Sequence, residues 1–213
     1  MSFKESISKS GFFIYYLFLL AGIFLLFLFE KGDILLWINK NHCTFQDWFF
    51  KYWTYLGDGL AFVVLIIFFI SIRKYRAIKM IILAIISQTI VIQGLKRVIF
   101  SDAVRPKLFF ENFSELHQVA GVDIHSYGSF PSGHTATAFT IAVILALIIR
   151  NKYTTALLMI AAILVGISRI YLLQHFFIDV YFGSLIGFLN GIIIYSWLES
   201  GSFNGKKGLK KGL

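Results

Sequence analysis

Long apolar segments constrain this chain more than any other feature of its 213 residues. Hydrophobic residues make up 58% of the chain and charged residues only 15%, which departs from the balance found in soluble domains. A helix needs about 20 mostly apolar residues to cross a bilayer, where the backbone has no hydrogen-bond partner except itself. The sequence therefore predicts an integral membrane protein.

Six segments are long and apolar enough to cross a membrane, which predicts an all-α fold built as a six-helix transmembrane bundle. The predicted spans cover residues 11–29, 55–72, 77–99, 132–149, 153–173 and 176–198. The segment 34–53 is too charged to cross but is rich in tryptophan, so we expect an interfacial segment after the first span. We assign residues 1–200 to a single membrane domain and residues 201–213 to a basic cytoplasmic tail.

The connection from Ser101 to Pro131 is the only long loop, and it lies between spans three and four. Loops of this length are more often lids or binding elements than spacers. Phe109, Phe110 and Phe113 within it either dip into lipid or form an aromatic cap over the helix ends.

Lysine and arginine are distributed unevenly between the two sides of this topology. If both termini are inside, the cytoplasmic side carries twelve of the twenty basic residues but only Glu5 and Glu199 among the acidic ones. The twelve are Lys4, Lys9, Arg73, Lys74, Arg76, Lys79, Arg150, Lys152, Lys206, Lys207, Lys210 and Lys211. We therefore expect cytoplasmic termini, in a bacterial inner membrane. Anchoring to the membrane surface accounts for the net charge of +9 better than nucleic-acid binding does.

Three clusters of polar residues meet at the outer side of this topology. The stretch from Lys96 to Arg105 ends span three, and Pro131-Ser132-Gly133-His134 opens span four. The third cluster, residues 168–179, covers the turn between spans five and six. The sequence therefore predicts one polar site at the outer membrane surface.

His175 and Asp179 in the third cluster are four positions apart, which places them on one face of a helix. The carboxylate can then orient one ring N–H and leave the other nitrogen free, an arrangement that suits a histidine nucleophile. A lone histidine is usually structural, but a carboxylate inside an apolar span is costly without a partner or a function.

The second cluster reads as the start of a helix, because proline and serine suit the first turn. Gly133 allows an anion to approach the backbone N–H groups there, so the segment is a plausible phosphate cradle. Arg105, Arg169 and Lys96 are the matching cations, and arginine suits bidentate contact with phosphate. The alternatives are a plain N-cap at Ser132, a membrane-surface histidine at His134 and cations that snorkel to lipid headgroups.

These motifs resemble those of the type-2 phosphatidate phosphatase superfamily, whose relatives include bacterial lipid phosphatases and vanadium haloperoxidases. The second family motif, Pro-Ser-Gly-His, is intact at residues 131–134, and the third is intact at Ser168, Arg169, His175 and Asp179. The first motif departs, because eight residues separate Lys96 from Arg105-Pro106 where the family usually has six. A widened turn near residues 101–103 would restore the reach of Lys96; otherwise Arg97 or Lys107 takes its place.

The resemblance implies that His175 attacks phosphorus, Asp179 orients its imidazole and His134 protonates the leaving oxygen and later activates water. It also implies that the phosphoryl oxygens bind Arg105, Arg169, Lys96 and the amides of Ser132 and Gly133. No cofactor or metal is expected, since the side chains and a helix end supply the positive charge.

The resulting prediction is a metal-independent phosphatase that acts on a lipid phosphate monoester or isoprenoid diphosphate at the outer face. A phosphotransferase using the same residues is the nearest alternative. A haloperoxidase fits the pocket but not the six apolar spans, because the related enzymes are soluble. A channel, transporter or scaffold with a buried polar network is the alternative outside enzymes. The exact lipid and the oligomeric state stay open.

Overall fold

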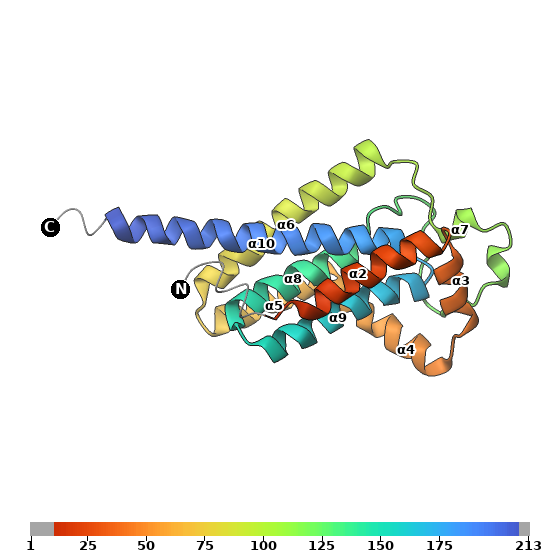
Figure 1. Cartoon of the computed structure of the whole chain (residues 1–213), viewed down its shortest axis with the longest axis horizontal. Helices are drawn as coiled ribbons and strands as arrows, with labels where there is room; N and C mark the ends of the chain where they lie inside the picture. Colours follow the sequence, from red (N-terminus) through yellow and green to blue (C-terminus); the bar gives the residue numbers. More distant parts are fainter. Residues whose placement is uncertain (1–10, 209–213) are drawn as a thin grey trace.

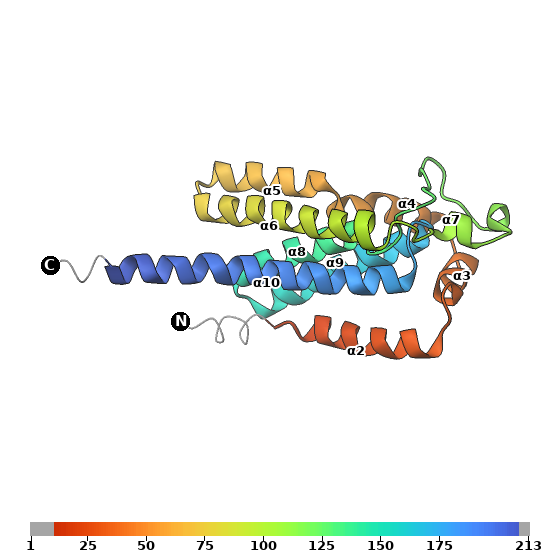
Figure 2. The same cartoon turned by 90° about the horizontal axis from the view of Figure 1, so that it is seen from above.

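The computed structural model describes residues 11–208, and its side chains are described for residues 11–199. Lys4, Lys9, Lys210 and Lys211, which the charge analysis places in the cytoplasm, lie outside the described residues. The long helices run roughly side by side along one axis (Figures 1 and 2). They are α2 (Phe13–Leu28), α5 (Gly59–Ser71), α6 (Tyr75–Gly94), α8 (Gly133–Ile149), α9 (Lys152–Tyr171) and α10 (Phe177–Gly208).

All regular elements in the described part of the chain are helical, as the apolar segments predict, apart from an isolated bridge between Val104 and Tyr127. Three helical segments are long and apolar enough to cross a membrane alone: residues 75–99, 152–171 and 177–199. The count rises to five if two bent pairs of helices each form one span, and α8, with 17 residues, is shorter. The six-span count therefore stays a prediction.

Helix α8 occupies the centre of the bundle and packs mainly against α9 and α10. It is apolar around its whole circumference, which is typical of a helix buried on all sides. Phe139, Val143 and Leu147 on α8 are fully enclosed. This central position fixes the start of α8, and with it the Pro-Ser-Gly-His motif, against the neighbouring helix ends.

Glycines at every fourth position let α10 approach the backbone of α8. A Cβ atom at Gly183 would lie 2.6 Å from the Ser132 carbonyl oxygen, and one at Gly187 would lie 2.2 Å from that of Ala136. Small residues at this spacing allow close helix contact inside a membrane, where packing rather than water exclusion holds helices together. This close contact between α8 and α10 is a feature that the apolar pattern of the sequence does not predict.

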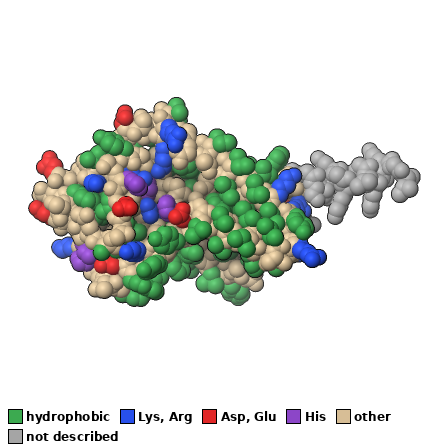
Figure 3. Space-filling view, turned by 180° about the vertical axis from the view of Figure 1, so that it is seen from behind, with side chains coloured by type: hydrophobic (Ala, Val, Ile, Leu, Met, Phe, Trp, Pro, Cys, Tyr) green, Lys and Arg blue, Asp and Glu red, His purple; other side chains and the backbone are tan. Residues whose placement is uncertain are grey.

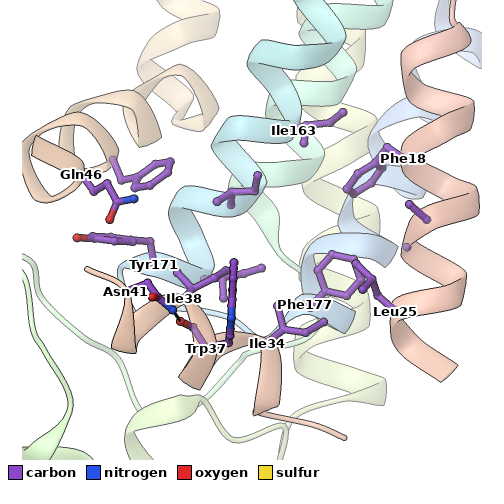
Figure 4. Close-up of a pocket in the computed structure, with 15 residues that line it drawn as sticks. Phe18, Leu25, Ile34, Trp37, Ile38, Asn41, Gln46, Ile163, Tyr171 and Phe177 are labelled. Atoms are coloured by element: carbon purple, nitrogen blue, oxygen red, sulfur yellow. Dashed lines mark hydrogen bonds between the residues drawn. The ribbon is translucent and has the colours of Figure 1, made fainter. Parts of the chain in front are cut away.

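The segment after α2 folds back sharply. Helix α3 (Asp33–Lys40) is bent by 103° from α2, and α4 (Thr44–Trp53) continues through the short 3-10 helix η1 (Thr54–Gly57) into α5. The predicted interfacial segment is thus helical. A mainly apolar cavity of about 400 Å³ lies between α2, α3, α4 and α9. Figure 4 shows Trp37 and Phe177 projecting toward it and Asn41 at its polar side.

The long loop before α8 contains α7 (Pro106–Phe109) and the 3-10 helix η3 (Phe113–Glu115). The Phe109 ring lies edge-on to Phe176, with centroids 5.0 Å apart, and Phe110 and Phe113 pack on the cluster around Leu35. These aromatic residues therefore cap the helix ends, one of the two arrangements that the sequence allows.

Helix α10 continues to Gly208, about ten residues beyond the predicted end of the last span. The described part of the predicted tail, residues 201–208, therefore continues this helix. Residues 201–208 contain three glycines and no apolar run, so neither helix propensity nor hydrophobic pattern predicts this extension.

Candidate active site

His175 and Asp179 lie where the chain turns from α9 into α10, and both side chains are almost completely buried. His175 Nδ1 is 3.5 Å from Asp179 Oδ2 and has no closer hydrogen-bond partner among the described residues. The turn is short because the His175 N–H donates to the carbonyl oxygen of Arg169. The predicted pair is thus assembled at one site, one helical turn apart.

Two further donors fix the Asp179 carboxylate. The Ser129 hydroxyl donates to Oδ2 at 2.5 Å, and the Phe176 N–H donates to the same oxygen at 2.9 Å. The Ser129 N–H in turn donates to the Ala103 carbonyl oxygen, which ties this serine to the loop after α6. Spacing alone gives no signal for Ser129, because its role depends on the path of the loop.

Ser132 is the N-cap of α8, and its Oγ accepts hydrogen bonds from the backbone N–H and the hydroxyl of Thr135. Its own N–H donates to the Asp179 carbonyl oxygen at 3.0 Å. That amide, which the sequence analysis assigned to phosphate, therefore already has a partner in this structure. Within the described part of the chain, the backbone N–H groups of Gly133 and His134, in the first turn of α8, have no such bond to another segment.

His134 lies on the first turn of α8, partly exposed, beside the cations of the other two clusters. It is close enough to Arg169, Lys96 and Arg105 to interact with them electrostatically, and Asp58 is the neighbouring carboxylate. Figure 3 shows one face of the molecule, where histidine, basic and acidic side chains gather on one half, next to a broad hydrophobic surface on the other.

Arg105 is buried in the loop and fixed by four hydrogen bonds. Its Nε donates to the Tyr127 carbonyl oxygen, Nη1 to Gln174 Oε1 and carbonyl oxygen, and Nη2 to the Gly128 carbonyl oxygen. Burial lowers the pKa of the Arg105 guanidinium, and the Asp179 carboxylate partly offsets this effect. Gln174, directly before His175, thus positions Arg105, a role that the sequence analysis missed.

Lys96 reaches the same carbonyl oxygen as Arg105, because its Nζ donates to Gly128 at 2.7 Å. The backbone from Leu95 to Ile99 is a π-helix, closed by the bond from the Phe100 N–H to the Leu95 carbonyl oxygen. A π turn holds more residues than an α turn, so it takes up part of the extra length in the first motif. We expected a widened turn near residues 101–103, but the widening begins upstream, at residues 95–99.

Arg169 sits at the end of α9, and its Nη1 donates to the Thr54 hydroxyl at 2.9 Å. Its Nε is buried and has no partner within the described part of the chain. Helix η1, which carries Thr54, packs directly on α8: a Cβ at Gly57 would lie 2.5 Å from the His134 carbonyl oxygen. Thr54 belongs to a segment far from the three motifs, so no local signal identifies it.

The structure thus brings together all the predicted site residues, at one end of the bundle. Buried cations surround a histidine, and at least one donor group, Arg169 Nε, is unpaired. Such a site can bind an anion and stabilise negative charge in a transition state. Within residues 11–199, no group of three or more His, Cys, Asp or Glu side chains is arranged to hold a metal ion.

Comparison with known proteins agrees with this arrangement. The family model of the PAP2 superfamily matches residues 77–201, which contain all three motifs. A lipid A 4'-phosphatase of Porphyromonas gingivalis is 28% identical over 178 residues, which cover 78% of this chain and 71% of the relative.

Two solved structures share the fold. The crystal structure of Aquifex aeolicus LpxE has a TM-score of 0.67 and 33% sequence identity, and the match covers 79% of this chain and 97% of LpxE. The phosphatidylglycerolphosphate phosphatase of Bacillus subtilis, a transmembrane PAP2 protein, has a TM-score of 0.63 and 23% identity over 92% and 96% of the two chains. The chain therefore belongs to the PAP2 superfamily, as its motifs indicate, and is an integral membrane phosphatase.

Proposed function

We propose that this protein hydrolyses a phosphate monoester of a membrane lipid through a phosphohistidine at His175. The observation that carries the proposal is the buried His175–Asp179 pair, enclosed by Arg105, Arg169 and Lys96. A neutral imidazole next to cations that bind phosphate is suited to nucleophilic attack, because the cations neutralise the charge that the nucleophile approaches.

In the first step, His175 Nε2 forms a bond to phosphorus as the bond from phosphorus to the lipid oxygen breaks. His134 supplies the proton that the leaving oxygen needs. Asp179 accepts the Nδ1–H of His175 and stabilises the positive imidazole, much as the buried aspartate does in a Ser-His-Asp triad. Ser129 and the Phe176 N–H keep the carboxylate in place.

In the second step, water attacks the phosphorus of the phosphohistidine and His134 takes its proton. The phosphorus–nitrogen bond breaks, inorganic phosphate leaves and His175 is regenerated. Arg105, Arg169 and Lys96 balance charge on the phosphoryl oxygens in both steps. This account needs no metal ion, so chelators should leave the rate unchanged.

A lipid substrate is supported by a groove beside the site. An apolar cavity of about 410 Å³ lies between η1, α5, α8 and α9, and Tyr55, Leu60, Ala138 and Ala161 are among the residues that line it. One end of this cavity is formed by η1, whose Thr54 hydroxyl accepts a hydrogen bond from Arg169. An acyl chain in this groove would place its headgroup next to the buried cations.

Lipid A phosphate leads the list of candidate substrates, because a relative named lipid A 4'-phosphatase aligns over most of this chain. Phosphatidate and phosphatidylglycerophosphate also carry a phosphate monoester, and undecaprenyl diphosphate presents a similar terminal phosphoryl group in an anhydride. The basic bias described above supports a site on the outer face of the membrane with both termini in the cytoplasm.

The test is phosphate release from these four lipids by the purified protein in detergent, with and without EDTA. We expect release from at least one lipid, unaffected by EDTA and lost in His175→Ala. Complete loss of phosphate release in the presence of EDTA, or turnover by His175→Ala, contradicts the mechanism. Addition of a lipid or sugar acceptor separates hydrolysis from phosphotransfer, since transfer yields a phosphorylated acceptor in place of phosphate.

A further inference from the structure

The end of the bundle opposite His175 contains a third cavity, of about 500 Å³, between α5, α6, α8 and α10. Its walls are mostly apolar and include Phe68, Phe69, Met80, Leu145 and Ile148. None of these residues takes part in the proposed chemistry, although Leu145 also lines the groove between α5, α8 and α9. The cavity lies at the far ends of the helices that lead to Lys96 and His134. It is therefore separate from the candidate active site.

Three basic side chains line this cavity: Lys74, Arg76 and Arg150. The only carboxylate in the lining is Glu199, which pairs with Arg76 at 3.2 Å. All three basic residues are exposed, so they are available to a ligand. Figure 3 shows basic side chains at this end of the molecule, at the edge of the hydrophobic surface. The lining thus combines an apolar interior with excess positive charge.

Arg150 is held in this position by an unusual backbone. It ends α8 in the left-handed conformation, with φ of 58°, where glycine is the usual residue. Its Nη2 donates to the buried Tyr195 hydroxyl at 2.7 Å, and its Nε donates to the Leu147 carbonyl oxygen. Arg73 and Leu173 adopt the same backbone conformation, so this conformation alone assigns no role to Arg150. Arg150 differs from both because its side chain lines the cavity and is held there by these two hydrogen bonds.

We propose that this cavity binds an anionic phospholipid, with an acyl chain against the apolar walls and the headgroup phosphate between Lys74, Arg76 and Arg150. The argument is charge complementarity. A cavity with apolar walls in a membrane fills with hydrocarbon, and the excess of cations at its edge selects a negative headgroup over a zwitterionic one. Basic pockets between membrane helices on the cytoplasmic side favour anionic lipids for the same reason.

The test uses the purified full-length protein in a neutral detergent, titrated with phosphatidylglycerol or phosphatidylcholine. Phosphatidylglycerol is a phosphodiester, so it offers no phosphate monoester to the active site. Thermal unfolding reports binding, because a ligand that binds only the folded state raises Tm. We expect phosphatidylglycerol to raise Tm more than phosphatidylcholine does, and the difference to shrink at high salt.

Arg150→Gln should weaken phosphatidylglycerol binding on the order of fivefold, from about 1 kcal/mol for each basic residue at such a surface. Arg73→Gln is the matched control. Arg73 has the same left-handed conformation, with φ of 54°, at the same end of the bundle, but does not line the cavity. Its variant should bind like the wild type.

Arg150→Gly covers the risk that the glutamine variant misfolds, because glycine relieves the left-handed backbone while removing the guanidinium. It should fold and show the same loss of lipid selectivity. The proposal is overturned if both lipids raise Tm equally in the wild type, if the Arg150 variants keep the selectivity, or if soluble glycerol phosphate alone reproduces the full effect. Phosphatase activity is not the readout, so this result is independent of the proposed reaction.

Discussion

The Ser129 hydroxyl and the His175 ring address the same oxygen of Asp179: Ser129 Oγ lies 2.5 Å from Oδ2, and His175 Nδ1 lies 3.5 Å from it. The serine therefore fixes the acceptor that the histidine needs. The Ser129 N–H also donates to the Ala103 carbonyl oxygen, so Ser129 links the loop that carries Arg105 to the His175–Asp179 pair at the start of α10.

Ser129→Ala should lower kcat about tenfold with little change in KM, because a hydrogen bond to a charged group contributes about 1.5–3 kcal/mol and only part of this is expressed in the transition state. Steady-state kinetics on the best lipid substrate measures this. Ser114→Ala, in the same long loop, is the control. A change in KM alone would assign Ser129 to substrate binding instead.

Lys96 is the basic residue of the first motif that shares a carbonyl oxygen with Arg105. Lys96→Met should therefore reduce kcat/KM by about 100-fold, in line with the loss of one charge-stabilising donor. Arg97→Met and Lys107→Met should stay near the wild-type rate, since Arg97 is exposed and Lys107 Nζ reaches only the distant Ile124 carbonyl oxygen. If kcat/KM falls more in Arg97→Met or Lys107→Met than in Lys96→Met, that residue, and not Lys96, fills the role of the motif lysine.

Gly187→Ala should destabilise the protein by about 1–3 kcal/mol, because the added methyl group overlaps the Ala136 carbonyl group and forces α8 and α10 apart. Gly94→Ala is the matched control: a Cβ at Gly94, in α6, meets no atom within 4 Å. Thermal unfolding in detergent should show a lower Tm for the first variant only. Equal Tm values would mean that the close contact adds nothing.

Ala161→Phe should raise KM for long-chain lipid phosphates and leave KM for a short-chain, soluble phosphate unchanged, because the ring fills the groove between α5, α8 and α9. Leu157→Phe, on the same helix but 67% exposed and outside the groove, serves as the control. If Ala161→Phe affects both substrates equally, the groove does not hold the acyl chain.

The helices and the meeting of the three motifs were predictable from the sequence. The apolar runs show where each long helix lies, within a few residues, although α2, α5 and α8 are shorter than the predicted spans. Their alternating direction then places Lys96, His134 and His175 at one end. Helix α10 is the exception, since its polar extension to Gly208 leaves no apolar signal.

The residues that position the site were not predictable, because their roles depend on the path of the chain between the motifs. Ser129 and Gln174 contact Asp179 and Arg105 through the folded loop, and Thr54 reaches Arg169 across 115 positions. The π-helix at Lys96 is similar: the spacing shows that residues are inserted, but not which turn takes them up.

The most direct test of the central claim is whether His175 becomes phosphorylated during turnover. The protein is mixed with radiolabelled lipid phosphate, quenched in base within milliseconds and digested, and the peptides are analysed for the label. We predict an acid-labile, base-stable label on the peptide that contains His175, absent in His175→Asn. Turnover with no label on that peptide, or a label retained in His175→Asn, would contradict the assignment of His175 as the nucleophile.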